Sequence, residues 1–394
     1  MSPWLLCLVA GLIACYAVLC SSVRFRRLNT MRKRLNFPDR ESLSRMTNED
    51  AQKIVHNLAV YEFPLLYDFS LRYAIFKAGS RISRYKISDL AKPSEASKRY
   101  ATFPPGSEAL AKSVARTNFL HKPYRQSGSI RNEDLLYVLF ASMYEPVRFM
   151  RLYEWRELAD MELAGIATFW KYIGEMMEID YKSELGKDRW KDGIEFLADL
   201  AEWAARYENK HLSPSPDTAK LGRVLVDLLL SAYPKFLREP GYKILMVLMG
   251  ERTRHAFGFP EPGVPESALA YTLLLARKLL VRHLCLPRLS PAKFIDQPDP
   301  VTGRIKHHHF LKDPWYTPVT FWSRWGPEAL FRRALGLKVA GDGGEAMLPE
   351  GFLFEDLGPR DRAGKGVEET ARLARVAQTK VSASACPFAL PRKA

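Results

Sequence analysis

Residues 107–126 read SEALAKSVARTNFLHKPYRQ, and this stretch decides how the chain folds. The motif Pro-Pro-Gly at 104–106 breaks the chain before it and Gly128 follows it, so we expect one helix over the whole stretch. Positions spaced by i, i+4, i+7 and i+11 share one face of a helix. Those positions hold Leu110, Val114, Thr117 and His121. His121 therefore continues a largely apolar stripe and should point inward.

An inward histidine at position 121 has two interpretations. A lone histidine on an apolar helix face is usually a core residue whose ring nitrogens are hydrogen-bonded. An inward imidazole is also the ligand that a haem iron or another transition metal requires. The spacing of His121 alone leaves both interpretations open.

The composition describes a folded, basic protein of 394 residues, with 47% hydrophobic and 12% aromatic residues. That length suits one large domain or two ordinary ones around a sizeable core. The net charge of +15 makes nucleic acid or an anionic membrane surface a candidate partner. No zinc-finger or aromatic-sheet motif is present, so we expect no nucleic-acid partner. The five cysteines form no disulfide framework, which fits a reducing compartment.

The N-terminal segment has the pattern of a membrane anchor. Trp4 to Cys20 is an uncharged apolar run, short for a membrane helix but sufficient in a thin membrane such as that of the endoplasmic reticulum. A cleaved signal peptide is the alternative, but its basic residues precede the apolar run, whereas here they follow it, between Arg24 and Arg34. The positive-inside rule places everything after residue 23 in the cytosol. The basic cluster can also lie on anionic lipid headgroups.

Helical patterns account for most of the remaining chain. Thr47 or Asn48 is a suitable N-cap for a helix that is kinked or broken at Pro64. Asn132 is expected to cap another helix, which Pro146 ends or bends. Further helices are expected at about 157–179, 188–209, 218–231, 241 onward and 265–286. Since no stretch alternates as β-strands do, we predict a single all-α globular domain.

The later parts of the chain are less regular. Residues 265–286 are the most apolar of the later helices; a second membrane span is the alternative to a buried or interfacial helix, but the basic residues between Arg277 and His283 make a span costly. Residues 80–106 are expected to be irregular. Beyond residue 287 the chain is rich in Pro, Gly and aromatic residues, which we expect to wrap the helical core.

The common enzyme motifs are absent from the sequence: there is no dinucleotide-binding or P-loop glycine pattern, no H-E-x-x-H, no C-x-x-C pair and no G-x-S-x-G elbow. Carboxylates at 160–162 and 175–178 lack the Glu-x-x-His pattern of a di-iron bundle, so we interpret them as solvated helix faces. Three histidines at 307–309 lie in a basic loop, and we interpret them as adventitious rather than functional metal ligands.

Arg125, Arg151 and Arg156 each lie beside an aromatic residue. One interpretation is an arginine–carboxylate network, for example with Glu145 or Glu154, that holds helices in register. The other is a clamp for haem propionates or for the acidic head of a substrate. The sequence leaves both open.

A set of motifs in fixed order resembles a known family. The motifs are Arg116-x-Asn118-x-Leu120-His121-x-x-Tyr124-Arg125, Asp134-Leu135-Leu136-Tyr137, Glu145-Pro146, Tyr153-Glu154-Trp155-Arg156, Phe169-Trp170, Asp192-Gly193, Tyr207-Glu208, Arg282-His283-Leu284-x-Leu286-Pro287-Arg288, Pro314-Trp315-Tyr316 and Arg324-Trp325-Gly326-Pro327-Glu328. Together with the N-terminal anchor, they resemble the fungal oxygenases of the mycophenolic acid pathway type, which are bound to the endoplasmic reticulum. Those are related to the catalytic domain of rubber oxygenase (latex-clearing protein). The likeness covers roughly residues 45–370.

This resemblance implies a globin-like helical domain that binds b-type haem and uses O2. It also implies oxidative cleavage of a C=C bond in the prenyl side chain of a lipophilic secondary metabolite. His121 aligns with the proximal haem histidine and is the expected iron ligand, and we expect Arg116 and Arg125 to contact the haem. Arg99 and Thr102 match distal polar residues of the family and are the expected catalytic residues.

One segment departs from the family pattern. The chain runs from Tyr100 to Thr102 straight into the break at 103–106, without the longer apolar segment of the family. A shortened distal segment makes a catalytically degenerate or non-enzymatic membrane-anchored helical protein the alternative to an oxygenase. The expected layout is a single-pass signal-anchor helix, a basic juxtamembrane segment, a helical oxygenase-like domain and a loose tail, at 1–23, 24–46, 47–370 and 371–394.

Overall fold

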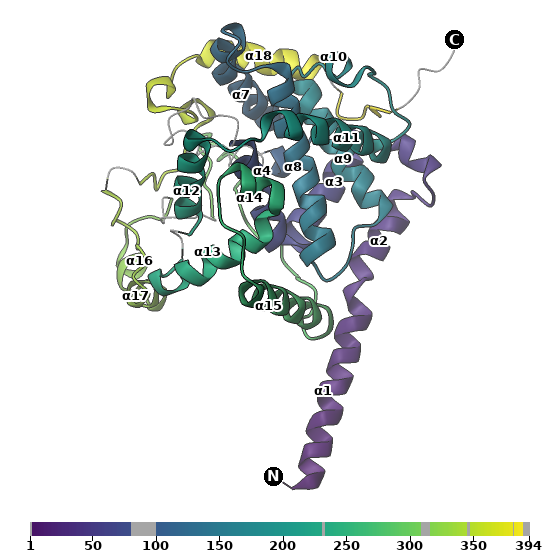
Figure 1. The fold of residues 1–394 in the computed structure, drawn as a ribbon, viewed down its shortest axis with the longest axis vertical. Coiled ribbons are helices and arrows are strands. Elements are labelled where there is room, and N and C mark those ends of the chain that lie inside the picture. Colours follow the sequence, from purple (N-terminus) through teal and green to yellow (C-terminus); the bar gives the residue numbers. More distant parts are fainter. Residues whose placement is uncertain are drawn as a thin grey trace.

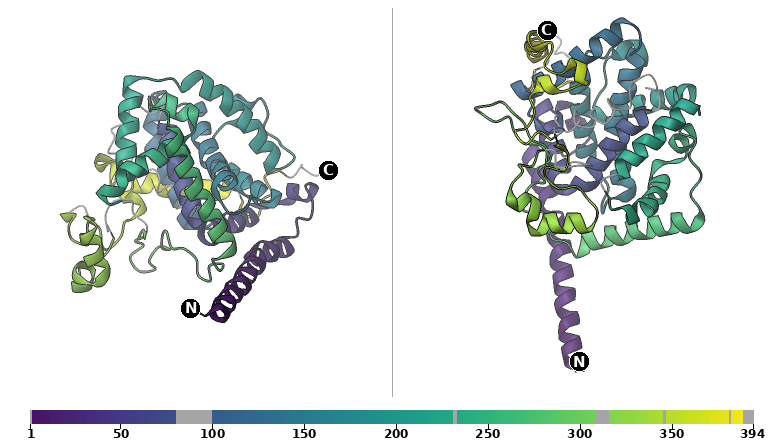
Figure 2. Two further views of the ribbon diagram at one scale, coloured as in Figure 1. Left: turned by 60° about the horizontal axis from the view of Figure 1, so that its bottom comes forward. Right: turned by 90° about the vertical axis from the view of Figure 1, so that its left-hand side faces the viewer.

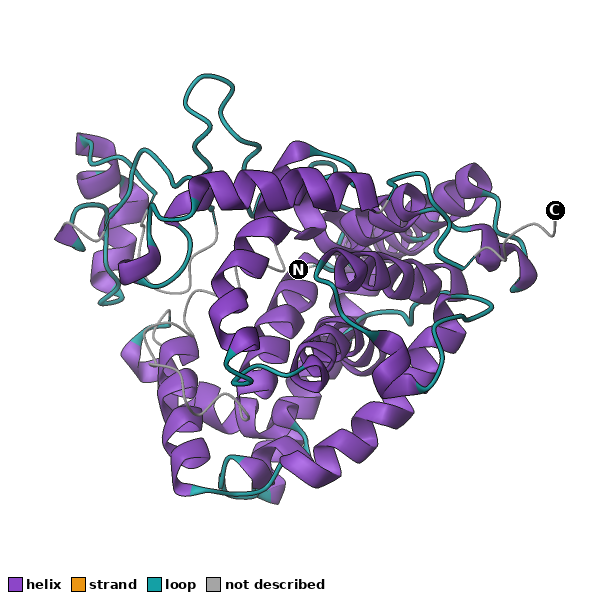
Figure 3. Cartoon of the chain, turned by 90° about the horizontal axis from the view of Figure 1, so that it is seen from above, coloured by secondary structure: helices purple, strands orange, loops and turns teal. Residues whose placement is uncertain are grey.

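The computed structural model describes residues 2–79, 100–230, 233–308, 316–344, 347–380 and 382–388. Within these ranges the regular elements are helices, and two isolated β-bridges join Ile295 to His307 and Ile305 to Phe352. Figure 3 shows the helices gathered into one body, and Figure 1 shows the N-terminal helix projecting from it. The predicted all-α fold is confirmed.

The projecting helix α1 (Pro3–Arg24) begins at the N-cap Ser2 and continues through Phe25 into α2 (Arg26–Leu35). The apolar side chains of α1 are almost all exposed, and the combined helix is long and apolar enough to cross a membrane. Figure 1 shows α1 leaving one end of the globular body, with α2 against its side. The structure therefore places a candidate membrane span where the sequence predicts one.

The first helical hairpin of the body follows the sequence pattern closely. The hydroxyl of Thr47 accepts a hydrogen bond from the backbone N–H of Asp50 at 3.1 Å, which makes Thr47 the N-cap of α3 (Asn48–Asn57). A π-helical turn, η2 (Leu58–Glu62), then leads to α4 (Pro64–Gly79). The predicted break at Pro64 is confirmed, because proline has no N–H to continue the ladder.

Three long helices form the centre of the body: α8 (Asn132–Tyr153), α9 (Asp160–Met176) and α11 (Gly193–His211). A fourth long helix, α7 (Glu108–Gln126), lies at one end of the body. α4 packs along α8, α3 packs along α9, and α11 crosses both α8 and α9. The close approach of α3 to α9 needs Gly165, because a Cβ there would lie 2.8 Å from Ile54.

Two details of α8 differ from the sequence expectation. The N-cap position is Arg131, whose backbone N–H donates to the carboxylate of Asp134 at 2.9 Å, and Asn132 is already the first helical residue. Pro146 does not end the helix, which continues for two further turns to Tyr153. A proline removes one donor, and the dense packing of α8 compensates for that loss.

The later helices surround this centre. They are α10 (Tyr181–Leu185), α12 (Pro216–Leu230), α13 (Lys235–Met249), α14 (Glu251–Ala256), α15 (Val264–His283), α16 (Phe321–Trp325) and α17 (Pro327–Ala334), with short 3₁₀ turns η1 (Glu41–Arg45), η4 (Phe354–Asp356) and η5 (Arg360–Arg362). α13 begins earlier than expected, since Pro240 lies inside it rather than before it.

The expected loose tail is wrong. α18 (Val367–Lys380) packs along α7 and buries Ala374 and Ala377 against it. Residues 382–385 then supply backbone carbonyls to N–H groups at the start of α3 that have no acceptor within the helix. One of these is the N–H of Asn48, which donates at 3.1 Å. The helix is amphipathic and its apolar side covers α7, so the C-terminal segment belongs to the core.

A buried ionic cluster ties four helices together. Lys77 on α4 contacts Glu145 on α8 at 3.1 Å and Glu208 on α11 at 2.6 Å. Arg148 and Arg252 add ion pairs of 2.6 and 2.8 Å to the same two carboxylates. Burial alone lowers the pKa of Lys77, but the two carboxylates raise it above its ordinary value, so the ammonium stays charged. The cluster holds α4, α8, α11 and α14 in register.

Candidate functional site

His121 lies on the C-terminal half of α7, on the stripe that the sequence predicts to point inward. Leu110 and Val114 are fully buried on this stripe, and Thr117 and His121 are partly buried. The inward direction of the stripe is confirmed for its first half, and His121 lies partly buried at the end of α7 farther from Ser107, the N-cap of the helix.

The imidazole of His121 is neutral at pH 7. Burial, and to a smaller extent the positive charge of Arg125, lower its pKa to about 4. Neither ring nitrogen forms a hydrogen bond with another residue in the part of the chain that the structure describes. The described residues therefore do not support the interpretation of His121 as a core histidine whose two ring nitrogens are both hydrogen-bonded. A neutral ring with a free lone pair is the form that binds a metal.

Tyr100 reaches the same face of α7. Its hydroxyl lies 2.7 Å from the hydroxyl of Thr117, one helical turn before His121, and its ring is buried. No sequence signal singled out Tyr100, because the contact joins two residues on separate helical segments. Residues 100–102 are helical, so the expectation of an irregular segment is wrong for this part.

Arg116 binds backbone carbonyls of this protein. Its guanidinium is almost fully buried and donates to the carbonyls of Glu355, Leu357, Arg362 and Lys365 at 2.5 to 3.0 Å. These four acceptors come from the loop before α18, which lies against α7. Since four of the five N–H donors are engaged, Arg116 serves the packing of this loop, and its contact with haem stays a prediction.

Arg125 is also engaged, but more weakly. It donates to the carbonyls of Met177 and Glu178 at 3.3 and 3.4 Å, at the C-terminal end of α9. Cations are favourable there because the last carbonyls of a helix carry partial negative charge. The structure places Arg125 one turn beyond His121, and its contact with a cofactor stays a prediction.

The two expected catalytic residues fall in different places. Arg99 lies outside the described residues. Thr102 is partly buried and faces a pocket on the opposite side from α7. Between them, Tyr100 faces Thr117, and the carbonyl of Ala101 accepts a 3.4 Å hydrogen bond from Gln52 on α3. Residues 100–102 therefore form a thin wall between Thr117 on α7 and the pocket.

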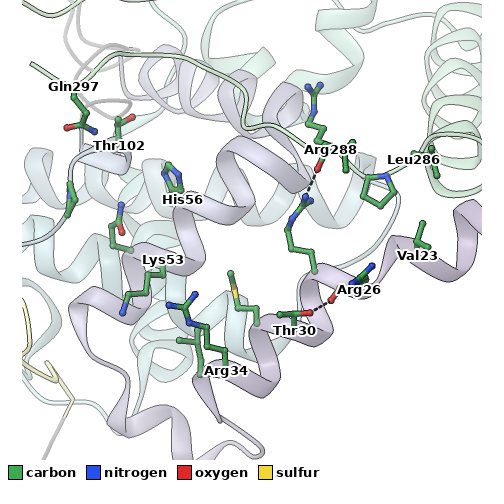
Figure 4. A pocket seen from close by; sticks show the side chains of 17 residues that line it. Val23, Arg26, Thr30, Arg34, Lys53, His56, Thr102, Leu286, Arg288 and Gln297 are labelled. Atoms are coloured by element: carbon green, nitrogen blue, oxygen red, sulfur yellow. Dashed lines mark hydrogen bonds between the residues drawn. The ribbon is translucent and has the colours of Figure 1, made fainter. Parts of the chain in front are cut away.

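The pocket on the far side of this wall encloses about 920 Å³. Figure 4 shows its side chains converging from α1 and α2, from α3, from residues 102–104 and from the segment after α15. Apolar residues such as Val23, Met31 and Leu286 line the end beside the membrane helix. The volume lies in the range of small-molecule pockets.

The pocket is strongly basic. Arg26, Arg34 and Arg288 line it, and none of them forms an ion pair with a residue that the structure describes. Burial lowers the pKa of His56, which also faces the pocket, so its ring is neutral. The sequence pattern did not single out His56. The other residues of the pocket are distant from His56 in sequence, so local spacing on α3 could not predict that they meet.

Part of the basic juxtamembrane cluster serves the fold rather than lipid. Arg24 is buried over the ring of Trp155 at 4.7 Å, and Arg27 pairs with Glu62 at 3.1 Å. Arg156 forms a bidentate pair with the fully buried Glu162 and also reaches Glu62. The network interpretation holds for Arg156, and the solvated-face interpretation is wrong for Glu162.

The remaining candidates contribute no site. Arg151 is exposed, and Glu154 pairs with Arg277 instead, at 2.8 Å. His307 stacks on Phe352 at 5.2 Å, and His308 contacts Asp296. Among the residues that the structure describes, no group of three or more His, Cys, Asp or Glu side chains could hold a metal ion.

The described residues thus form an all-α body with one helix long and apolar enough to cross a membrane, and His121 has no hydrogen-bond partner among them. Residues 99–279 match the family model described as ER-bound oxygenase mpaB/B'/Rubber oxygenase, catalytic domain. The chain belongs to this family, because its similarity to curated members extends over nearly its whole length.

Three relatives show the extent of the similarity. The ER-bound oxygenase mpaB' of Penicillium brevicompactum is 35% identical and covers 98% of this chain and 95% of its own length. The ER-bound oxygenase mpaB of the same organism is 34% identical over 91% of this chain and 90% of its own. The mpaB of Penicillium roqueforti (strain FM164) is 34% identical over 64% of this chain and 89% of its own. The first alignment runs over 410 positions, more than this chain has, so this chain lacks some positions of that relative.

Proposed function

We propose that this protein is an oxygenase anchored in the endoplasmic reticulum membrane, that it uses haem b, and that it cleaves a C=C bond in the prenyl side chain of a lipophilic secondary metabolite. The observation that carries the proposal is the similarity to ER-bound oxygenases over 98% of the chain. The family description also includes a rubber oxygenase, and rubber is an isoprenoid polymer. The globular body lies on the cytosolic side, as the basic residues after α1 favour.

The haem component rests on His121. An axial ligand must be neutral and must offer a free nitrogen, and His121 meets both conditions. Its ring is partly buried on the stripe of α7 that begins with the fully buried Leu110 and Val114. When bound, haem would supply an iron centre for O2, and the protein would supply orientation and a dry environment. Among the described residues no group of three or more His, Cys, Asp or Glu side chains could hold an iron ion, so the proposed iron would be held by His121 and a porphyrin.

The pocket beside the wall suits the substrate. Its apolar end near Val23 and Leu286 matches a prenyl chain, and its basic rim matches a polar or acidic head. A long prenyl chain partitions into membrane at about 0.8 kcal/mol per buried CH2, so a pocket beside a membrane helix meets concentrated substrate.

The proposed reaction balances without an external reductant. The C=C bond breaks, each carbon takes one oxygen atom of O2, and two carbonyl groups form. Thr102 faces the pocket and can donate one hydrogen bond toward a bound chain or oxygen atom. The catalytic role of Arg99 stays a prediction because that residue lies outside the described part.

The test uses the full-length protein in lipid nanodiscs. Iron and haem content are measured, and the protein is then incubated with farnesyl phenyl ether and ¹⁸O₂. The proposal predicts about one haem per chain and two carbonyl fragments that each carry one ¹⁸O. A folded, colourless protein that contains no iron and forms no fragments contradicts it. That result would favour the non-enzymatic anchored protein, to which the shortened segment after Tyr100 points.

A further inference from the structure

The outer face of α15 is apolar although it is exposed. Half or more of the surface of Leu269, Leu273, Leu275, Leu279 and Leu280 is open to solvent, and Ala270 is the one residue that the helix buries fully. A continuous exposed apolar face of this length is rare on a soluble surface and marks a contact with lipid or protein. Of the two placements expected for this helix, buried or interfacial, the buried one is wrong, because most of α15 is exposed.

Two charged residues of α15 point the other way. Arg277 donates to Glu154 on α8 at 2.8 Å, and Glu266 pairs with Lys243 on α13 at 3.4 Å. These ion pairs lie on the side of α15 that packs on the globular body, whereas Arg282, in the last turn, is exposed. Over most of its length α15 therefore turns charge inward and leucines outward, the reverse of a surface helix in water. The apolar face points away from the body.

The contacts between α15 and α1 set the depth of α15. The hydroxyl of Tyr16 donates to the carbonyl of Leu284 at 3.2 Å, and Ser21 lies 2.9 Å from His283. The apolar run of α1 ends at Cys20, so Tyr16 lies about 6 Å inside that end. Helices that lie in the membrane interface sit about 5–10 Å into the boundary of headgroups and acyl chains. The C-terminal end of α15 is therefore at interfacial depth.

Figure 2 shows the remaining geometry. In its right-hand view α15 lies crosswise to α1, at the end of the body from which α1 emerges. Figure 1 places α16 and α17 at the same end. These two short helices expose Phe321, Trp322 and Phe331. Aromatic residues of this kind are common at membrane interfaces.

We propose that α15 is a second membrane element, which lies in the cytosolic-leaflet interface with its leucine face in lipid. The occupant of the face is the bilayer, because α1 already fixes the bilayer at that level. The residues after α15, Leu286 to Arg288, line the pocket at 102–104 and His56. An interfacial α15 would hold the mouth of that pocket at the headgroups. The inference concerns membrane placement and does not depend on the proposed reaction.

The experiment measures the depth of single labels in the full chain. The five cysteines, Cys7, Cys15, Cys20, Cys285 and Cys386, are replaced by serine or alanine. Ala276→Cys on the exposed face of α15 is labelled with the fluorophore NBD in phosphatidylcholine vesicles that contain 5-doxyl phosphatidylcholine. Ala205→Cys is the matched control, because it is also an exposed helical alanine, on α11 at the opposite end. Asn29→Cys on α2 controls for mere closeness to the membrane.

The proposal predicts a blue-shifted emission and severalfold more quenching by the doxyl lipid at position 276 than at positions 205 or 29. Equal quenching at 276 and 29 overturns it, since α15 would then only be near the surface. A blue-shifted label at 276 without lipid quenching also overturns it, because protein, such as a second copy, would cover the face. Circular dichroism of each variant verifies that the labelled chains are folded.

Discussion

The face of α7 that carries His121 and the pocket beside α3 lie on opposite sides of residues 100–102, and they are built differently. On the α7 side, Arg116 donates to four carbonyls, and His121 is neutral and has no hydrogen-bond partner among the described residues. On the pocket side, Arg26 and Arg34 have no acidic partner among the described residues. The comparison teaches that an arginine near a site must be judged by what already satisfies its donors.

The largest effect is expected at Arg116. In Arg116→Ala, four buried carbonyls lose their donor, so the free energy of unfolding should fall by about 3–5 kcal/mol. Hydrogen exchange in residues 355–365 should rise at the same time. Arg125→Ala is the control, with a loss below about 1 kcal/mol because its two bonds are long. Equal losses in the two variants would break the contrast between them.

The next effect is the pH dependence of His121 without haem. Its pKa is about 4 in the folded protein and is near 6.5 when unfolded, so the unfolded chain binds a proton first as pH falls. Stability is present above the unfolded pKa and is lost as pH falls toward the folded pKa. Between pH 7 and pH 5 the loss should reach about 2 kcal/mol.

The variant His121→Gln isolates this contribution, because its side chain does not titrate. Unfolding of both proteins in detergent at pH 7 and pH 5 gives the difference directly. The same loss in both proteins would show that other groups cause it and that His121 is not desolvated.

A smaller effect separates the pocket from the haem region. His56→Trp fills part of the pocket, so we expect product formation from farnesyl phenyl ether to fall about tenfold, with stability changed by less than about 1 kcal/mol. The haem spectrum should not change. His308→Trp, outside the pocket, is the matched control. Unchanged turnover in His56→Trp would show that the substrate does not bind in this pocket.

The smallest effect concerns the neighbour of His121. Arg125 contributes to the lowered pKa of His121, so Arg125→Ala should raise that pKa by a few tenths of a unit. Histidine NMR signals recorded across pH 3–7 measure the change. A fall in the pKa would contradict the assigned sign of the Arg125 charge.

Much of the fold is readable from local sequence. Thr47 as an N-cap, the break at Pro64 and the inward stripe of α7 all follow from spacing within a few residues. The C-terminal helix α18 was missed because its amphipathic pattern is short and its partner, α7, is distant in sequence. The helical start of α13 before Pro240 was missed because proline is tolerated in a packed helix.

The candidate site was less predictable, for the same physical reason. The roles of Arg116 and Arg277 depend on acceptors far away in the chain, Glu355 and Glu154 among them. The pocket joins α2, α3 and the segment after α15, and no local motif encodes such a meeting. Sequence spacing placed His121 on the same stripe as Leu110 and Val114, but only the structure shows that its ring has no hydrogen-bond partner in the described part of the chain.

The most direct measurement is the visible spectrum of the purified full-length protein and of two histidine variants. The account predicts a Soret band in the parent protein and in His56→Ala, and its loss, with the bound iron, in His121→Ala. A Soret band that survives in His121→Ala, or one that His56→Ala removes instead, would contradict the assignment of His121 as the haem ligand.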